Sequence, residues 1–147
     1  MNKKQKSLNN KGFSLVELII VIAIMAVLIG VLAPQYIGYV KKSKQSSDIQ
    51  NAQSLATEIG VVISDVEAGN STKTYVSDGS YNEITTGLVS AVPTLKTVTT
   101  SGTKLYYQVD SNNIVHIAYG TAAPTNTDND LYPKLGTTAK TIYTEIK

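Results

Sequence analysis

Apolar residues are concentrated near the N-terminus of this chain. The sixteen positions from Leu18 to Ala33 carry neither a charge nor a hydrogen-bonding side chain, whereas Thr, Ser, Asn, Gly and Tyr dominate the C-terminal half. A helix from Phe13 to Ala33 would be about 32 Å long, and the hydrocarbon core of a bilayer is roughly 30 Å thick. The pattern therefore predicts a helix that can span a membrane.

A second helical pattern follows Pro34. Apolar residues recur there at three- and four-residue spacing, as in an amphipathic helix; they are Ile49, Ala52, Leu55, Ala56, Ile59, Val62, Ile63 and Val66. Gly69 and Asn70 are typical of a helix C-terminus. A helix from Phe13 to about Gly69 would be roughly 85 Å long, so we expect half of it to protrude from a compact head.

Pro34 lies between the two patterns. Proline lacks an amide hydrogen and its ring clashes with the carbonyl four residues earlier, which is that of Gly30. One alternative is a helix that stops at Ala33. The apolar periodicity further along favours a helix that resumes, with a kink at Gly30 and Pro34.

The residues after Gly69 predict a small head. Asn82 to Val92 indicates a short helix that Pro93 terminates. Lys104 to Asp110 and Ile114 to Tyr119 are β-branched or aromatic runs separated by a Ser-Asn-Asn turn, which indicates a hairpin.

The C-terminal run from Thr141 to Ile146 predicts a third strand, and the loop from Gly120 to Gly136 is expected to be held by packing and hydrogen bonds. About 78 residues follow Gly69, too few to bury a large core alone. We therefore expect an α+β fold in which the stripe from Ile49 to Val66 packs against an antiparallel sheet of three or four strands.

The charges are also unevenly placed. Four lysines (Lys3, Lys4, Lys6 and Lys11) lie in the first twelve residues without an acid, which leaves nine basic residues against eleven acidic ones in the rest of the chain. This mildly acidic balance gives no indication of a nucleic-acid partner. The basic flank is expected to stay on the cytoplasmic side of a membrane.

Glu17 distinguishes the apolar run from a plain membrane anchor. A charge in a membrane span costs on the order of 2.5 to 3.5 kcal/mol or more, depending on depth, and a plain anchor gains nothing from it. The run also ends without the small-residue cleavage site of a secretory signal. A cut after Gly12 would instead remove the lysines and leave the span intact.

The string from Lys11 to Glu17, KGFSLVE, resembles the type IV prepilin motif of the type IVa kind. The resemblance implies that a prepilin peptidase cleaves after Gly12 and that the new terminus, Phe13, is N-methylated. It also implies that Glu17 is the assembly residue, and we expect its carboxylate to pair with the Phe13 amine of a neighbouring subunit.

The same resemblance implies the organisation of the whole chain. Residues 1–12 would be the leader, 13–34 the membrane and filament-core half of the helix, 35–69 its amphipathic half, and 70–147 the head. The precursor would sit in the inner or cytoplasmic membrane until an assembly platform and its ATPase polymerise it. The product would be an extracellular homopolymer, a type IV pilus used in adhesion, aggregation or motility.

The chain has no cysteine, which excludes disulfides, Cys-ligated zinc and thiol catalysis. It therefore lacks the disulfide that closes the C-terminal loop of many Gram-negative pilins, and it resembles Gram-positive major pilins in this respect. We expect no cofactor and no metal. The segment from Asn126 to Asp130 lacks the glycine and glutamate of a calcium loop and predicts an Asx-rich surface turn.

The same sequence features fit other functions. A type II secretion or competence pseudopilin shares the leader, Glu17 and the helix, and an uncleaved membrane-anchored binding protein would share the span. An anchored enzyme is disfavoured, because His116 is the only histidine and lies in an alternating strand that favours a structural role.

Overall fold

The computed structural model describes residues 12–143. The chain forms two compact units, the first ending at Tyr39 and the second beginning at Val40. In chain order the elements are α1 (Leu15–Glu67), β1 (Asn82–Glu83), β2 (Lys104–Val109), β3 (Val115–Gly120), the 3-10 helix η1 (Thr127–Asn129), β4 (Asp130–Tyr132) and α2 (Thr137–Tyr143). The predicted α+β class is confirmed.

Helix α1 is continuous through Pro34, so the alternative of a helix ending at Ala33 is wrong. A kink of its axis at Gly30 and Pro34 stays a prediction. At the C-terminal end, Gly69 has a positive φ of 73°. The Gly69 N–H donates to the Val66 carbonyl (3.0 Å) and the Asn70 N–H to the Asp65 carbonyl (2.8 Å), the two bonds of a Schellman motif.

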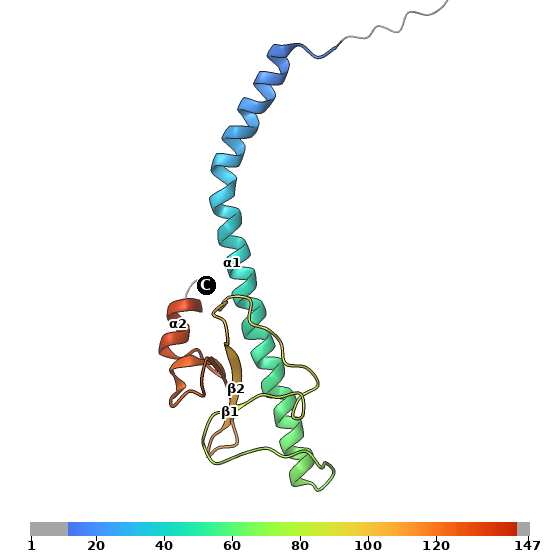
Figure 1. Ribbon diagram of the computed structural model, residues 1–147, viewed down its shortest axis with the longest axis vertical. Helices are drawn as coiled ribbons and strands as arrows, with labels where there is room; N and C mark the ends of the chain where they lie inside the picture. The colour runs from blue at the N-terminus through green and yellow to red at the C-terminus, as the bar shows by residue number, and fades with distance from the viewer. Residues whose placement is uncertain (1–11, 144–147) are drawn as a thin grey trace, which may run out of the picture. The chain divides into compact units, whose positions relative to one another are not determined.

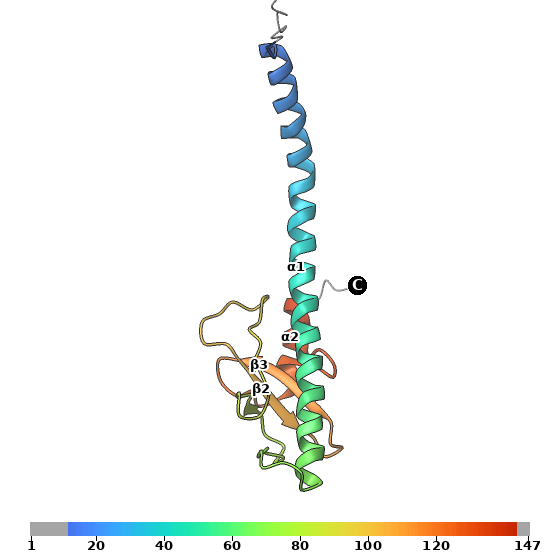
Figure 2. The same cartoon turned by 90° about the vertical axis from the view of Figure 1, so that its right-hand side faces the viewer.

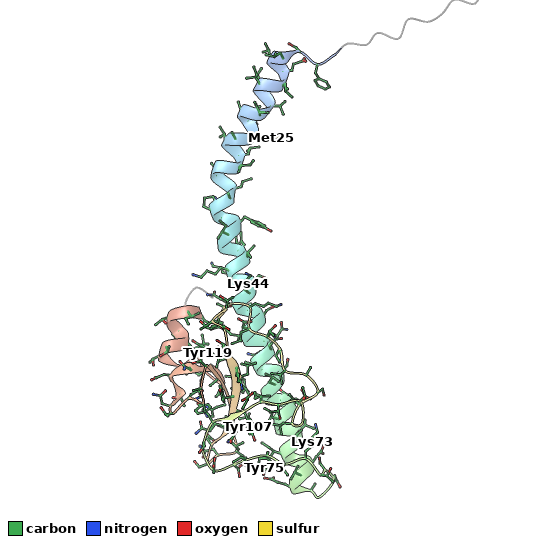
Figure 3. The ribbon with its side chains drawn as sticks, in the orientation of Figure 1. Met25, Lys44, Lys73, Tyr75, Tyr107 and Tyr119 are labelled. Atoms are coloured by element: carbon green, nitrogen blue, oxygen red, sulfur yellow. The ribbon has the colours of Figure 1, made fainter. Side chains whose placement is uncertain are left out.

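The first unit presents its side chains to the outside. Every residue from 12 to 37 is exposed, including Met25, which Figure 3 labels. Its most apolar window has a mean hydropathy of 3.1, and α1 is long and apolar enough to cross a membrane by length and composition. Because no part of this unit covers these side chains, their apolar surface is available to lipid or to another protein chain.

The second unit contains a four-stranded antiparallel sheet in the order β1-β2-β3-β4. Lys104 pairs with Gly120 and Val109 with Val115, so the predicted hairpin is confirmed within one residue at its ends. Figures 1 and 2 show β2 beside the C-terminal half of α1. The Asp110 N–H donates to the Ile114 carbonyl at 3.0 Å and closes the hairpin turn.

The core lies between this half of α1 and the sheet. The predicted apolar stripe supplies Ala52, Leu55, Ala56, Ile59, Val62 and Ile63, all of which are buried. The sheet supplies alternate residues of β2 and β3, including Tyr107 and Tyr119 (Figure 3). The predicted packing of the stripe against the sheet is confirmed.

The prediction of a helix from Asn82 to Val92 is wrong. Asn82 and Glu83 instead pair with Tyr107 and Tyr106 as the edge strand β1, and the Ile84 N–H donates to the Leu105 carbonyl at 2.9 Å. Pairing with a strand more than twenty residues away thus replaces the local helical preference.

The predicted strand from Thr141 to Ile146 is also wrong within the described residues. Thr137–Tyr143 forms α2, and residues 144–146 lie outside the described part of the chain. Ala139 and Tyr143, four residues apart, are both buried against the core. β4 pairs with the outer edge of β3. This edge is therefore already occupied and cannot accept a C-terminal strand.

Candidate processing and assembly site

The N-terminus of α1 is capped by a reciprocal pair of hydrogen bonds. The Ser14 backbone N–H donates to Glu17 Oε2 at 2.8 Å, and the Val16 N–H donates to Ser14 Oγ at 3.3 Å. This is the arrangement of a capping box, in which a Ser at the N-cap and a Glu three residues later satisfy free N–H groups of the first turn. The carboxylate also lies at the positive end of the helix dipole.

The capping role of Glu17 was missed in the sequence, although Ser14-Leu15-Val16-Glu17 fits the S-x-x-E pattern. That pattern before an apolar run was the signal that could have found it. In the uncleaved chain the carboxylate therefore already has a hydrogen-bond donor within its own first turn.

Gly12 and Phe13 precede the helix and are fully accessible. Both lie outside regular secondary structure, and the Phe13 side chain is 91% exposed. A Cβ atom at Gly12 would meet no heavy atom within 4 Å. The peptide bond between these residues therefore lies in an open, non-helical segment, where an extended chain can enter a peptidase.

The five residues singled out by the sequence fall into two places. Gly12, Phe13 and Glu17 line one shallow hollow with Ser14 at the start of α1. Gly30 and Pro34 lie several turns further along the same helix. Glu17 is the only charged residue between Lys11 and Lys41, so its carboxylate has no charged partner in the intervening sequence.

Two buried polar residues of α1 hold the head together. Asp48 accepts hydrogen bonds from the backbone N–H groups of Lys96 and Thr97, both at 2.8 Å, and from the Tyr143 hydroxyl at 3.2 Å. Gln45 Nε2 donates to the Ile142 carbonyl at 2.6 Å. Both side chains are fully buried.

Gln45 and Asp48 were missed because polar residues on an amphipathic helix usually face solvent. Both residues extend the apolar stripe toward the N-terminus at three- and four-residue spacing. One helix face therefore carries Gln45, Asp48, Ala52, Leu55 and Ile59. That spacing was the signal in the sequence.

A second polar cluster surrounds the single histidine. Asp130 is buried, accepts a hydrogen bond from the Tyr81 hydroxyl, and lies 2.6 Å from His116 Nδ1 through Oδ2. Burial raises the pKa of the Asp130 carboxyl, while its hydrogen bonds to Tyr81 and His116 act in the opposite direction. Burial also raises the pKa of the Tyr81 phenol.

The predicted surface turn from Asn126 to Asp130 is confirmed in part. The Asp128 N–H donates to Asn126 Oδ1 at 3.1 Å, which makes the expected Asx turn at the start of η1. Asp130, however, is 2% exposed. Its placement on the surface was wrong, because it begins β4 and pairs with Ala118 of β3.

Comparison with known proteins concerns the N-terminal segment. Residues 7–33 match the family described as the prokaryotic N-terminal methylation motif. No solved structure matches the chain. The matched segment contains Gly12, Phe13, the Ser14–Glu17 cap and the exposed apolar run. Residues 7–33 of this chain therefore carry the prepilin signature of type IV pilins.

Proposed function

We propose that this chain is the major pilin of a type IV pilus. Its apolar helix holds the precursor in the membrane, a prepilin peptidase cleaves after Gly12, and the processed chain polymerises into an extracellular filament. In this proposal residues 13–34 become the filament core and residues 70–147 form the head. The loop-rich head favours a pilin over a pseudopilin.

The observation that carries the proposal is the combination of Glu17 with an exposed apolar helix. Side chains on every side of α1 are exposed from Leu15 to Ile37, which suits a helix surrounded by lipid and later by other helices. Such a helix tolerates one carboxylate only where that carboxylate has a partner.

Cleavage would change the environment of this carboxylate. Phe13 directly precedes Ser14, whose N–H donates to Glu17. A cut after Gly12 would therefore place a new α-amine one residue from the cap, and α-amines carry a positive charge below a pH of about 7.7 to 8.0. Methylation leaves the nitrogen able to carry that charge.

In the filament this amine would select the register between subunits. A carboxylate buried among apolar helices without a charged partner is strongly destabilising. Axial positions that bring Glu17 of one copy to Phe13 of the next are therefore favoured over all others. The ion pair would determine stagger more than overall strength.

The transfer from membrane to filament provides little hydrophobic free energy, because lipid tails are as apolar as leucine side chains. Helix packing and the ion pair would stabilise the assembled state. Extraction from the bilayer would require an assembly platform and an ATPase supplied by other chains.

Two measurements on the same cells test the proposal. Electron microscopy should show long surface fibres in cells with this chain and none after its deletion. Intact mass of the sheared fibre protein should correspond to a chain that begins at N-methylated Phe13. Processed protein without long fibres would instead indicate a pseudopilin, and a chain that begins at Met1 would indicate an uncleaved anchor.

A further inference from the structure

Two tyrosines follow the apolar run of α1 within the first unit. Tyr36 and Tyr39 lie three residues apart on one face of the helix, and each is 69% exposed. The positions from Leu18 to Ala33 carry no hydrogen-bonding side chain. The tyrosines therefore mark the end of the exposed apolar surface, where hydroxyl groups first become available.

The aromatic residues of the first unit are confined to the two ends of its apolar run. Phe13 lies at one end and Tyr36 and Tyr39 at the other, with none between them. A tyrosine has an apolar ring and a polar hydroxyl group, and it is enriched where lipid acyl chains meet the headgroups. The positions of these two tyrosines therefore suit the boundary of a bilayer.

The length of the helix fits this placement. Leu15 and Tyr36 are 21 residues apart in α1, which is about 32 Å, and the hydrocarbon core is roughly 30 Å thick. With Tyr36 at one boundary of the core, the first helical residue reaches the other boundary. Tyr39 then extends about 4.5 Å further, into a headgroup layer that adds roughly 5 to 8 Å on each side.

The opposite end of the first unit independently requires the same depth. Gly12, Phe13 and Ser14 are not helical, and a lipid-exposed, non-helical backbone is not tolerated in the hydrocarbon core, because its polar groups would be unpaired. Glu17 lies 19 residues before Tyr36, a distance of about 28 Å along the helix. Its carboxylate would then lie near the boundary of the core, where a charge costs less than at the centre.

We propose that Tyr36 and Tyr39 bind the phospholipid headgroup layer at the extracellular surface of the membrane and so fix the depth of α1. Each ring lies among the upper acyl chains, and each hydroxyl group donates to an ester or phosphate oxygen of a lipid. Apolar side chains alone leave the helix free to tilt or slide, whereas interfacial aromatic residues restrict it.

This depth also determines where cleavage takes place. With the tyrosines at the extracellular surface, the Gly12–Phe13 bond lies at the cytoplasmic surface, where a peptidase can reach it. This step rests on the proposed function. Tyr36 and Tyr39 are therefore positioning residues for processing, although they lie at the other end of the apolar helix.

Tryptophan fluorescence measures the depth directly, because the chain has no tryptophan. Tyr36→Trp, Tyr39→Trp and Met25→Trp are made singly in the full-length chain, which is reconstituted in phosphatidylcholine vesicles with lipids brominated at different depths. We expect the probe of Tyr36→Trp to lie about 15 Å from the bilayer centre, half the core thickness. The probe of Met25→Trp (Figure 3), about 16 Å away along the helix, should lie near the centre.

Replacing both tyrosines by leucine tests whether they set this depth. In the Met25→Trp chain, Tyr36→Leu with Tyr39→Leu extends the apolar run at its C-terminal end, so its midpoint moves by two to three residues, or about 4 Å. The fluorescent probe should move from the bilayer centre by that amount. Ile37→Leu is the matched control, because Ile37 is 68% exposed and stays apolar, and its probe should not move. Far-ultraviolet circular dichroism checks the helix content of each variant.

Cleavage in cells tests the consequence for processing. Misplacing a reacting bond slows catalysis, so the double leucine variant should accumulate at least about twice the uncleaved fraction of the wild type, and Tyr36→Trp with Tyr39→Trp should be cleaved normally. A Tyr36→Trp probe at the depth of the Met25→Trp probe, an unquenched Tyr36→Trp probe, or an unmoved probe in the double leucine variant would overturn the proposal.

The two proposals fail in different ways. Normal cleavage of the double leucine variant, despite a moved probe, would overturn the positioning role and leave the proposed function standing. A wild-type chain that keeps Met1 would refute the proposed function, and the fluorescence depths would still decide whether the tyrosines anchor the helix.

Discussion

Glu17 caps its own helix through a 2.8 Å hydrogen bond from the backbone N–H of Ser14 to its Oε2 atom. This bond gives the carboxylate a hydrogen-bond donor within its own chain. The proposed pairing with a neighbour's Phe13 amine would then add a charge partner to a group that is already oriented. Capping and register selection are separable, because capping needs only an acceptor whereas the ion pair needs a negative charge.

Glu17→Gln separates these two roles. The amide oxygen of glutamine can still accept from Ser14 N–H, as it does in capping boxes, but it carries no charge. We expect cleavage close to the wild-type level and loss of most surface fibres, measured by immunoblot and electron microscopy. Glu17→Ala should lose fibres as well, and normal piliation in Glu17→Gln would refute the register role.

Gly12→Val tests the processing site. A Cβ atom at residue 12 meets no heavy atom within 4 Å, so the fold should be unaffected and only entry into the peptidase should change. We expect the leader to be retained, which intact mass would show. Gly38→Ala is the control, since a Cβ there also meets nothing within 4 Å, and its cleavage should be normal.

Asp48→Ala should destabilise the head. The substitution leaves the partly buried Lys96 and Thr97 N–H groups without their acceptor, and an unsatisfied buried polar group costs about 1 to 3 kcal/mol. We expect a loss of about 2 to 5 kcal/mol in unfolding free energy, measured by denaturant titration in detergent. Asp65→Ala, at an exposed position of the same helix, should change it by less than about 0.5 kcal/mol.

Gly69→Ala should weaken the end of α1. Gly69 has a φ of 73°, and a left-handed conformation costs a residue with a Cβ roughly 1 to 2 kcal/mol. Gly60→Ala is the matched comparison, because Gly60 lies within α1 and a Cβ there meets nothing within 4 Å. It should stabilise by up to about 1 kcal/mol. The same thermal scans compare both variants, and equal shifts would contradict the Schellman geometry.

We expect the folded head to lose stability in acid because of the hydrogen bonds that Glu58 accepts. The hydroxyl and the N–H of Ser90 both donate to its Oε1 atom at 2.6 Å, and these bonds lower the pKa of the Glu58 carboxyl in the folded state. A carboxyl whose pKa is lowered by folding contributes stability above its unfolded pKa of 4.5. This stability is lost as the pH falls through the folded pKa.

We therefore expect Glu58→Gln to lose less thermal stability than the wild type as the pH falls from 6 into the acid range below the unfolded pKa. Its Tm at pH 6 should be lower than that of the wild type, because the charge-assisted bonds are gone. Asp65→Asn should follow the wild-type pH curve. An unchanged acid slope in Glu58→Gln would contradict the assigned role of Ser90.

The features that could be predicted from sequence are those that depend on nearby residues. The three- and four-residue spacing from Ile49 to Val66 predicted the buried face of α1, and two β-branched and aromatic runs predicted the hairpin of β2 and β3. The S-x-x-E pattern at Ser14 was equally local and was overlooked. Glycine after the last apolar residue predicted the end of α1.

The predictions that were wrong concern segments whose structure depends on partners far along the chain. Asn82 and Glu83 form a strand because Tyr106 and Tyr107 present a free edge, and Thr137–Tyr143 is helical in a position where its Ala139 and Tyr143 side chains reach the core. Neither partner is visible in a short window of sequence, and short segments have weak preferences of their own.

The sequence by itself determined the apolar helix, the prepilin signature around Gly12 and the amphipathic stripe, because charge, hydropathy and periodicity act over a few neighbouring residues. Only the tertiary structure decided that Asp48 and Asp130 are buried. Their carboxylates are tolerated inside the head because Lys96, Thr97 and Tyr143 donate to that of Asp48. Tyr81 donates to that of Asp130, which also lies 2.6 Å from His116 Nδ1. A buried charge is stable only with such donors, and folding alone brings them together.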